Sequence, residues 1–189
     1  MGIPSKAECL IMAFRSRKVA ERERAIPALA KLKHPPLPLL RRLAASSAHG
    51  VERRCAFEVL QQRRDPSALK LARKYLRDPY MSVRLVANQV IAQMGGRSAA
   101  LKIMPGLKDP SGGVRVNCAA LLGQLRDRRA VPALLPALRD KEWYVRQAAA
   151  EALGHIADSR AKNALKRICK DPRKCVSAAA RKSLALCST

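Results

Sequence analysis

The side chains with which this chain could bind a ligand are overwhelmingly cationic. The 189 residues include 38 Lys and Arg but only 14 Asp and Glu, which gives a net charge of +24. Such an excess costs self-repulsion, and an anionic partner relieves it. Arg binds phosphate or carboxylate oxygens through paired hydrogen bonds, and Lys binds them as a point charge. The composition therefore favours a polyanion as the partner, with an acidic protein surface as the alternative.

The positive charge is concentrated in two lobes. Residues 15–77 have a net charge of +12 and residues 128–189 one of +9, whereas residues 78–127 have only +3. Basic residues recur as adjacent pairs in both lobes, and we predict that these pairs contact nucleic acid. The predicted contacts are Arg41, Arg42, Arg53, Arg54, Arg63 and Arg64 in the first lobe, and Arg128, Arg129, Lys166, Arg167, Lys170, Arg173, Lys174, Arg181 and Lys182 in the second.

The sequence offers little that could catalyse a reaction. His34, His49 and His155 have no acid or Ser at a spacing that suggests a triad, and Gly95-Gly96 is typical of a turn rather than a phosphate loop. The six cysteines show no zinc-ligand spacing. We therefore expect no catalytic residue, no metal and no cofactor, and we expect that the protein is not an enzyme.

The cysteines indicate a structural role and a reducing environment. Cys55, Cys118 and Cys187 fall at repeat positions that otherwise hold small or apolar inward residues. Buried free thiols behave as small hydrophobes and are typical of a reducing compartment. No apolar run approaches 18 residues, and no secretory signal is recognisable. We expect a protein without a membrane span, located in the cytoplasm, the mitochondrial matrix or the plastid stroma.

The elements that must position these side chains repeat every 31 residues. Each repeat contains an Asp, a Val five residues later and an aliphatic residue thirteen residues after the Asp. The Asp positions are 78, 109, 140 and 171, the Val positions are 83, 114, 145 and 176, and the aliphatic residues are Ile91, Leu122, Leu153 and Leu184. A fixed period of this length predicts stacked supersecondary units, and hence a solenoid with a long surface.

Each period contains two predicted helices. Residues 142–156 place apolar side chains at helical spacing and form the second helix of a pair, while residues 129–138 form a first helix. We expect Asp78, Asp109 and Asp171 to act as N-caps, each with proline in the first helical position. Asp127 and Asp158 precede the first helices in the same way. Pro105 and Pro136 should bend those helices.

The repeat weakens toward the N-terminus without vanishing. Residues 51–60 and 25–32 echo the second helix, the former with one extra residue before Asp78, and residues 4–14 form a plausible first helix. We predict an all-α solenoid of about six HEAT-like helical pairs, with about twelve helices in total. It forms a single domain over 1–189, in which residues 1–64 are divergent repeats and residues 65–189 regular ones.

Residues 127–158, from Asp127 to Asp158, resemble the HEAT-like repeat of the phycobilisome-lyase type, and the resemblance extends over about 65–189. This superfamily includes bilin lyases, alkyl-base DNA glycosylases, adaptors and assembly factors, so the resemblance implies an architecture and leaves the activity open. It also implies that Arg84, Arg115 and Arg146 pair with the repeat aspartates in a ladder between neighbouring units. Glu151 is the one acid that could serve a glycosylase, and no aromatic residue recurs near it in the repeat.

Phosphate contact is the mode of binding that this composition suits. Only six residues are aromatic, which leaves few platforms for stacking bases, and no base-reading module is recognisable. Trp143 and Tyr144 are a weak candidate contact, since they can equally pack on a turn. We expect a non-catalytic, basic scaffold that docks on structured RNA or a ribonucleoprotein such as a ribosome; duplex DNA is possible. The alternative is an adaptor for an acidic protein whose specific contacts come from Asn88, Gln89, Asn117, Gln124 and Gln147.

Overall fold

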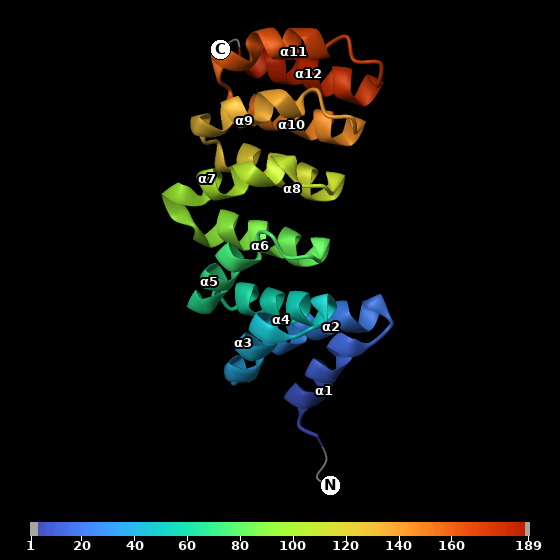
Figure 1. Cartoon of the computed structure of the whole chain (residues 1–189), viewed down its shortest axis with the longest axis vertical. Coiled ribbons are helices and arrows are strands. Elements are labelled where there is room, and N and C mark those ends of the chain that lie inside the picture. The colour runs from blue at the N-terminus through green and yellow to red at the C-terminus, as the bar shows by residue number, and fades with distance from the viewer. Residues whose placement is uncertain (1–3, 188–189) are drawn as a thin grey trace. The chain divides into compact units, whose positions relative to one another are not determined.

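The computed structural model describes residues 4–187, and over this range it contains twelve α-helices, five short 3-10 helices and no strand. The chain divides into two compact units, residues 1–90 and 91–189, with the boundary inside α6. The predicted number of helices and their grouping in pairs are confirmed (Figure 1). None of the helices in the described range is long and apolar enough to cross a membrane.

The first unit is built from three helical pairs, each with a short connection. Its core contains fully buried Phe14, Leu29, Leu40, Phe57 and Leu60. Helix α4 packs against both α3 and α2, as expected for stacked pairs. The helices are α1 (Lys6–Met12), α2 (Val19–Ala30), α3 (Leu37–Ser46), α4 (Gly50–Gln62), α5 (Pro66–Tyr75) and the first turns of α6 (Met81–Met94).

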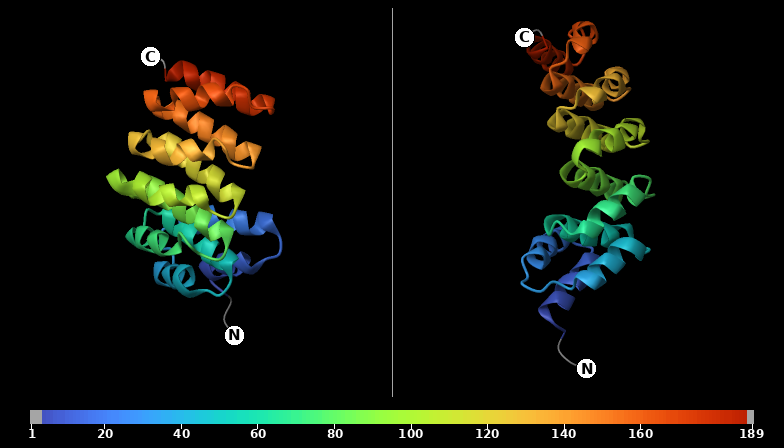
Figure 2. Two further views of the ribbon diagram at one scale, coloured as in Figure 1. Left: turned by 45° about the horizontal axis from the view of Figure 1, so that its top comes forward. Right: turned by 90° about the vertical axis from the view of Figure 1, so that its left-hand side faces the viewer.

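The second unit repeats the same pair three times. Long second helices α8, α10 and α12 pack successively on one another, and shorter first helices α7, α9 and α11 each pack on their own partner (Figures 1 and 2). The helices are α7 (Ala99–Ile103), α8 (Gly112–Leu125), α9 (Val131–Ala137), α10 (Trp143–Ile156), α11 (Lys162–Ile168) and α12 (Lys174–Leu186). The 3-10 segments are η2 (Gly96–Ser98), η3 (Met104–Lys108), η4 (Arg128–Ala130) and η5 (Ser159–Ala161).

The first helices are shorter than the apolar pattern predicted. The expected helix 129–138 begins with the 3-10 turn η4 and is α-helical only as α9. Pro136 lies inside α9, whereas α7 gives way at Ile103 to the 3-10 segment η3, which contains Pro105. Proline lacks the N–H that an α-helical bond needs, so it shortens one helix and converts the end of the other to 3-10 geometry.

The second helices approach each other closely where side chains are small. A Cβ added to Gly154 would lie 2.4 Å from the Ser183 hydroxyl and 2.9 Å from the Ser183 Cα. One repeat earlier, a Cβ added to Gly123 would lie 2.8 Å from the Cα of Ala152. Glycine at these two positions therefore permits the contact between α8 and α10 and between α10 and α12.

The predicted N-caps at Asp78, Asp109 and Asp171 are wrong. Helices α6, α8 and α12 begin three residues after these aspartates. The carboxylates accept a hydrogen bond from the backbone N–H two residues on, for example from Ser111 to Asp109 at 2.9 Å, and so shape the turn before the helix. The Asp-Pro cap does occur at Asp65, which accepts from the N–H of Ser67 at the start of α5.

The 31-residue register continues into the first unit without an insertion. Arg53 stands 31 residues before Arg84 and donates, as Arg84 does, to a main-chain oxygen six residues earlier in the preceding turn. Ser47 and Ser16 replace the repeat Asp and accept from the N–H two residues on. The extra residue expected before Asp78 is therefore absent. It had been inferred from Val51, which is exposed.

Candidate polyanion-binding surface

A ladder of ion pairs connects successive helical pairs and neutralises part of the positive charge. In the second unit Arg115 donates from Nε and Nη2 to the carboxylate of Asp140, at 2.7 and 2.9 Å. Arg146 repeats this toward Asp171, at 2.7 and 3.2 Å. Each of these two arginines also donates to a backbone oxygen of its own turn, so it joins two turns. The ladder implied by the family resemblance is thus present for Arg115 and Arg146.

The ladder includes a residue that the sequence analysis assigned to nucleic acid. In the first unit Arg53 donates from Nη2 to both oxygens of Asp78 at 3.0 Å, and its guanidinium lies 5.1 Å from the Tyr80 ring centre. Only 8% of Arg53 is exposed. Because a phosphate could not reach this guanidinium without breaking the ion pair, Arg53 is a framework residue and the prediction for it is corrected.

A second ladder links the opposite ends of the pairs. Arg129 binds the carboxylate of Asp127 and donates to the backbone oxygen of Arg97 at 2.6 Å. Arg160 binds Asp158 in the same manner and donates to the backbone oxygen of Arg128 at 2.9 Å. The sequence analysis missed this arrangement, although Asp and Arg recur there at the repeat interval.

These contacts stabilise the charged form of the framework carboxylates. The side chain and the backbone of Arg160 lower the pKa of Asp158 to about 2. The hydrogen bonds from Arg146 likewise hold the pKa of Asp171 below its ordinary value, because they stabilise the carboxylate over the neutral acid. The repeat aspartates are therefore ionised and occupied at neutral pH.

Two further arginines of the first predicted set have carboxylate partners. Arg41 donates to Asp65 at 2.6 Å, although its side chain is half exposed. Arg54 lies between Glu23 and Glu58, both at 2.6 Å, and its side chain is largely buried. Arg54 is therefore a second framework residue, and the prediction for it is corrected as well.

The remaining predicted residues are exposed. In the first unit these are Arg42, Arg63 and Arg64; Arg63 also donates to the backbone oxygen of Ala30. In the second unit all nine are exposed, although Arg129 holds Asp127 and Arg181 donates to the backbone oxygen of Cys169. The nine are Arg128, Arg129, Lys166, Arg167, Lys170, Arg173, Lys174, Arg181 and Lys182.

The structure also shows a periodic row of cations, which we call the turn row. Its members each stand one position before a ladder aspartate and are exposed, where the first helix passes into the turn. The turn row consists of Lys108, Arg139 and Lys170 in the second unit, with Arg77 at the equivalent position of the first. The sequence analysis named only Lys170. The 31-residue interval between basic residues was the signal that could have found the others.

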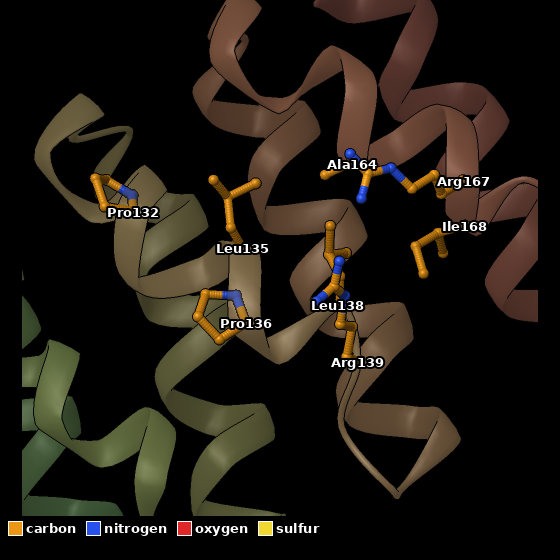
Figure 3. A pocket seen from close by; sticks show the side chains of 8 residues that line it. All are labelled: Pro132, Leu135, Pro136, Leu138, Arg139, Ala164, Arg167 and Ile168. Carbon is orange, nitrogen blue, oxygen red and sulfur yellow. The ribbon is translucent and has the colours of Figure 1, made fainter.

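Between α9 and α11 lies an open groove of about 460 Å³. Pro132, Leu135 and Pro136 line it from α9, and Ala164 and Ile168 line it from α11. The side chains of Arg139 and Arg167 extend along the same groove, so that two cations border an apolar floor (Figure 3).

The aromatic, acidic and thiol groups considered in the sequence lie apart from any such site. Trp143 and Tyr144 pack edge to face and are each more than a third exposed. Glu151 is exposed and accepts from Gln147 at 2.9 Å. Cys55, Cys118 and Cys187 are buried, as predicted, while Cys9 and Cys175 are exposed. Over residues 4–187 no three His, Cys, Asp or Glu side chains gather as a metal site would require.

Comparison with known proteins gives the fold. Residues 99–185 match the family of HEAT repeats. Human deoxyhypusine hydroxylase is 22% identical over 99% of this chain and 86% of its own, with a TM-score of 0.51. A designed armadillo repeat protein in complex with the peptide (KR)4 is 17% identical over 97% of this chain and 100% of its own, with a TM-score of 0.67. A search of the curated proteins finds no relative.

A Kap121p mutant is also similar, with 14% identity over 96% of this chain and 24% of its own and a TM-score of 0.74. These likenesses confirm the predicted class, an all-α solenoid of helical repeats, with HEAT repeats in its second half. At such low identities they carry no activity or ligand to this chain. The structures include an enzyme as well as a peptide-binding scaffold, so the fold by itself does not decide between catalysis and binding.

Proposed function

We propose that this protein is a non-catalytic scaffold that binds the phosphate backbone of structured RNA, free or within a ribonucleoprotein such as a ribosome. The observation that carries the proposal is the unequal use of the two charges. At least ten of the 14 carboxylates form ion pairs, most of them with framework arginines. The exposed lysines and arginines therefore outnumber the carboxylates that could neutralise them.

The turn row supports an extended anion. In the second unit, Lys108, Arg139 and Lys170 occupy equivalent positions of successive helical pairs. Packed helices lie about 8–10 Å apart, so these charges recur along the stack at roughly that spacing. A nucleic-acid backbone presents negative charge repeatedly along its length, which a small anion does not. Such contacts position a nucleic acid without reading its bases.

The comparison with the designed armadillo protein supports an anionic ligand through the sign of the charge. That protein is in complex with a basic peptide. The present chain has a net charge of +24, and a similar architecture with this charge would repel such a peptide. The finer resemblance to phycobilisome-lyase repeats stays an interpretation of the sequence, and nothing in our proposal depends on a bilin.

The test compares two lysine pairs with the same change in charge. Affinity for a fluorescent RNA hairpin is measured by anisotropy between 50 and 200 mM KCl for the native chain, for Lys108→Gln/Lys170→Gln and for the control Lys31→Gln/Lys33→Gln. We expect the first variant to bind more weakly and to lower the slope of log K against log salt by about 2, since each duplex phosphate contact contributes about 0.9. The control should change the slope by less than half as much.

Two outcomes would contradict the proposal. Absence of hairpin binding by the native chain at about 100 mM KCl would exclude RNA docking. Equal losses in the two variants would show that binding follows net charge and not the turn row. Tighter binding of a DNA duplex of the same length would replace RNA by DNA as the ligand.

The alternative, an adaptor for an acidic protein, loses part of its predicted contact surface. Asn88 is 2% exposed and donates to the backbone oxygen of Arg84, so it cannot contact a partner. Gln147 binds Glu151, whereas Gln124 is exposed. A different surface, the groove between α9 and α11, gives the adaptor reading a specific basis.

A further inference from the structure

We propose that the groove between α9 and α11 binds an acidic, amphipathic segment of a partner protein. Apolar side chains of that segment would pack on Leu135, Pro136 and Ile168, and its carboxylates would pair with Arg139 and Arg167. The five apolar side chains of the floor carry no hydrogen-bonding group, while the two guanidinium groups supply paired donors in planar geometry (Figure 3). This inference is independent of RNA binding by the turn row lysines.

The walls of the groove are held in place before a ligand arrives. The Arg146–Asp171 ion pair joins the turn after α9 to the turn after α11. At the other end, Arg160 donates to the backbone oxygen of Arg128 and connects the starts of the same two helical pairs. Leu134 and Leu165 are fully buried beneath the groove. A preformed site loses less conformational entropy on binding than one that must be ordered.

The chemistry of the floor favours a peptide over a phosphate backbone. Phosphate groups are strongly hydrated and gain nothing from Pro132, Leu135 or Pro136, and no aromatic ring lines the groove to stack on a base. An acidic segment with Leu or Phe between its carboxylates satisfies the floor and the two arginines together. Grooves of this kind with a few polar groups are the usual form of a specific site.

A second copy of this chain does not fit as the occupant. It would bring a further net charge of +24, and most of its carboxylates are already held in ion pairs. The partner must therefore supply acidic groups that this chain does not have to spare.

An adjacent groove extends the site. Between η3 and α9 a cavity of about 370 Å³ is lined by Met104, Leu107 and Lys108, and it shares Pro132 and Pro136 with the first groove. The two prolines thus form a ridge with an apolar groove on each side and a cation beside each. An extended segment that crosses this ridge can place apolar side chains in both grooves.

The test uses two labelled peptides and the full chain. Both have twelve residues and six carboxylates, and the other six residues are Leu and Phe in one peptide but Ser and Gly in the other. We expect the amphipathic peptide to bind about tenfold more tightly. Arg139→Gln/Arg167→Gln should weaken it about tenfold or more, and Lys31→Gln/Lys33→Gln, the matched control, should not.

Methyl spectra locate the site without a mutation. With the isoleucine methyl groups labelled, the amphipathic peptide should shift the Ile168 signal and leave the buried Ile103 and Ile156 signals in place. Equal binding of both peptides, or an unmoved Ile168 signal at saturation, would overturn the proposal. A hairpin RNA that shifts Ile168 in place of the peptide would show that the groove is part of the nucleic-acid surface instead.

Discussion

The guanidinium of Arg146 and the carboxylate of Asp171 form two hydrogen bonds, at 2.7 and 3.2 Å, between residues 25 positions apart. Through them the turn before α10 is fixed to the turn before α12. Because Arg115 and Asp140 repeat the arrangement one unit earlier, the ladder sets the geometry on which the turn row and the groove depend.

Breaking this pair should destabilise the second unit. Asp171→Ala leaves the largely buried Arg146 without its partner, and we expect a loss of about 3 kcal/mol in the free energy of unfolding. The double variant Asp171→Ala/Arg146→Met should lose less than the sum of the single changes, measured by urea unfolding. Additive losses, each below about 0.5 kcal/mol, would show that the ladder is not a stabilising element.

Acid should weaken the framework at a definable pH. The pKa of Asp158 is about 2 in the folded chain, below the value of about 3.9 for an unfolded Asp. Its contribution to stability is therefore complete above about pH 4 and is lost as the pH falls toward 2. Asp158→Asn should remove this contribution, so its stability should fall less steeply between pH 4 and pH 2 than that of the native chain. Identical slopes in urea titrations would contradict the assignment.

Two helix ends carry backbone strain that glycine can relieve. Arg126 and Ala157 close α8 and α10 in the left-handed conformation, with φ of 50° and 52°. Side chains disfavour this conformation by about 1 kcal/mol or more, so Ala157→Gly should stabilise the chain by up to about 1 kcal/mol. Gly96→Ala, at φ +57° with open space around the added Cβ, is the reverse control and should destabilise it. A lower melting temperature for Ala157→Gly would refute this account.

The approach of α10 to α12 limits the size of residue 154. Gly154→Val brings a branched side chain against the backbone of Ser183, and we expect a loss of about 1–3 kcal/mol from overpacking. Adding Ser183→Gly should restore part of this loss, because it removes the nearest atoms. No recovery in the double variant, measured by thermal unfolding, would place the clash elsewhere.

Thiol reactivity should separate the cysteines by burial. Burial raises the pKa of Cys118 to about 12 and that of Cys55 to about 11, so neither thiol is ionised at pH 8. In the native chain iodoacetamide should modify Cys9 and Cys175, which are exposed, and spare Cys55 and Cys118 until the protein unfolds. Mass spectrometry of digested samples distinguishes these sites, and rapid modification of native Cys118 would contradict its buried position.

The fold was within reach of the sequence because its signal is periodic. Residues 31 positions apart occupy the same place in successive pairs, so one well-read unit predicts its neighbours. The same regularity led to the ladder of Arg115 and Arg146. It failed for the turn caps, since Asp109 and Asp171 bind a backbone N–H before the helix begins, and a sequence pattern does not distinguish a shaped turn from a cap.

The sequence by itself determined the all-α repeat, its length, the excess of positive charge and the inward position of small residues such as Cys118. Only the tertiary structure decided which cations are occupied. Arg53 and Arg54 are adjacent and alike in the sequence, yet one binds Asp78 from the next pair and the other binds Glu23 from the preceding one. Whether a charge is neutralised depends on atoms brought within about 3 Å by packing, and composition cannot show this. The groove between α9 and α11 likewise exists only where two first helices lie side by side.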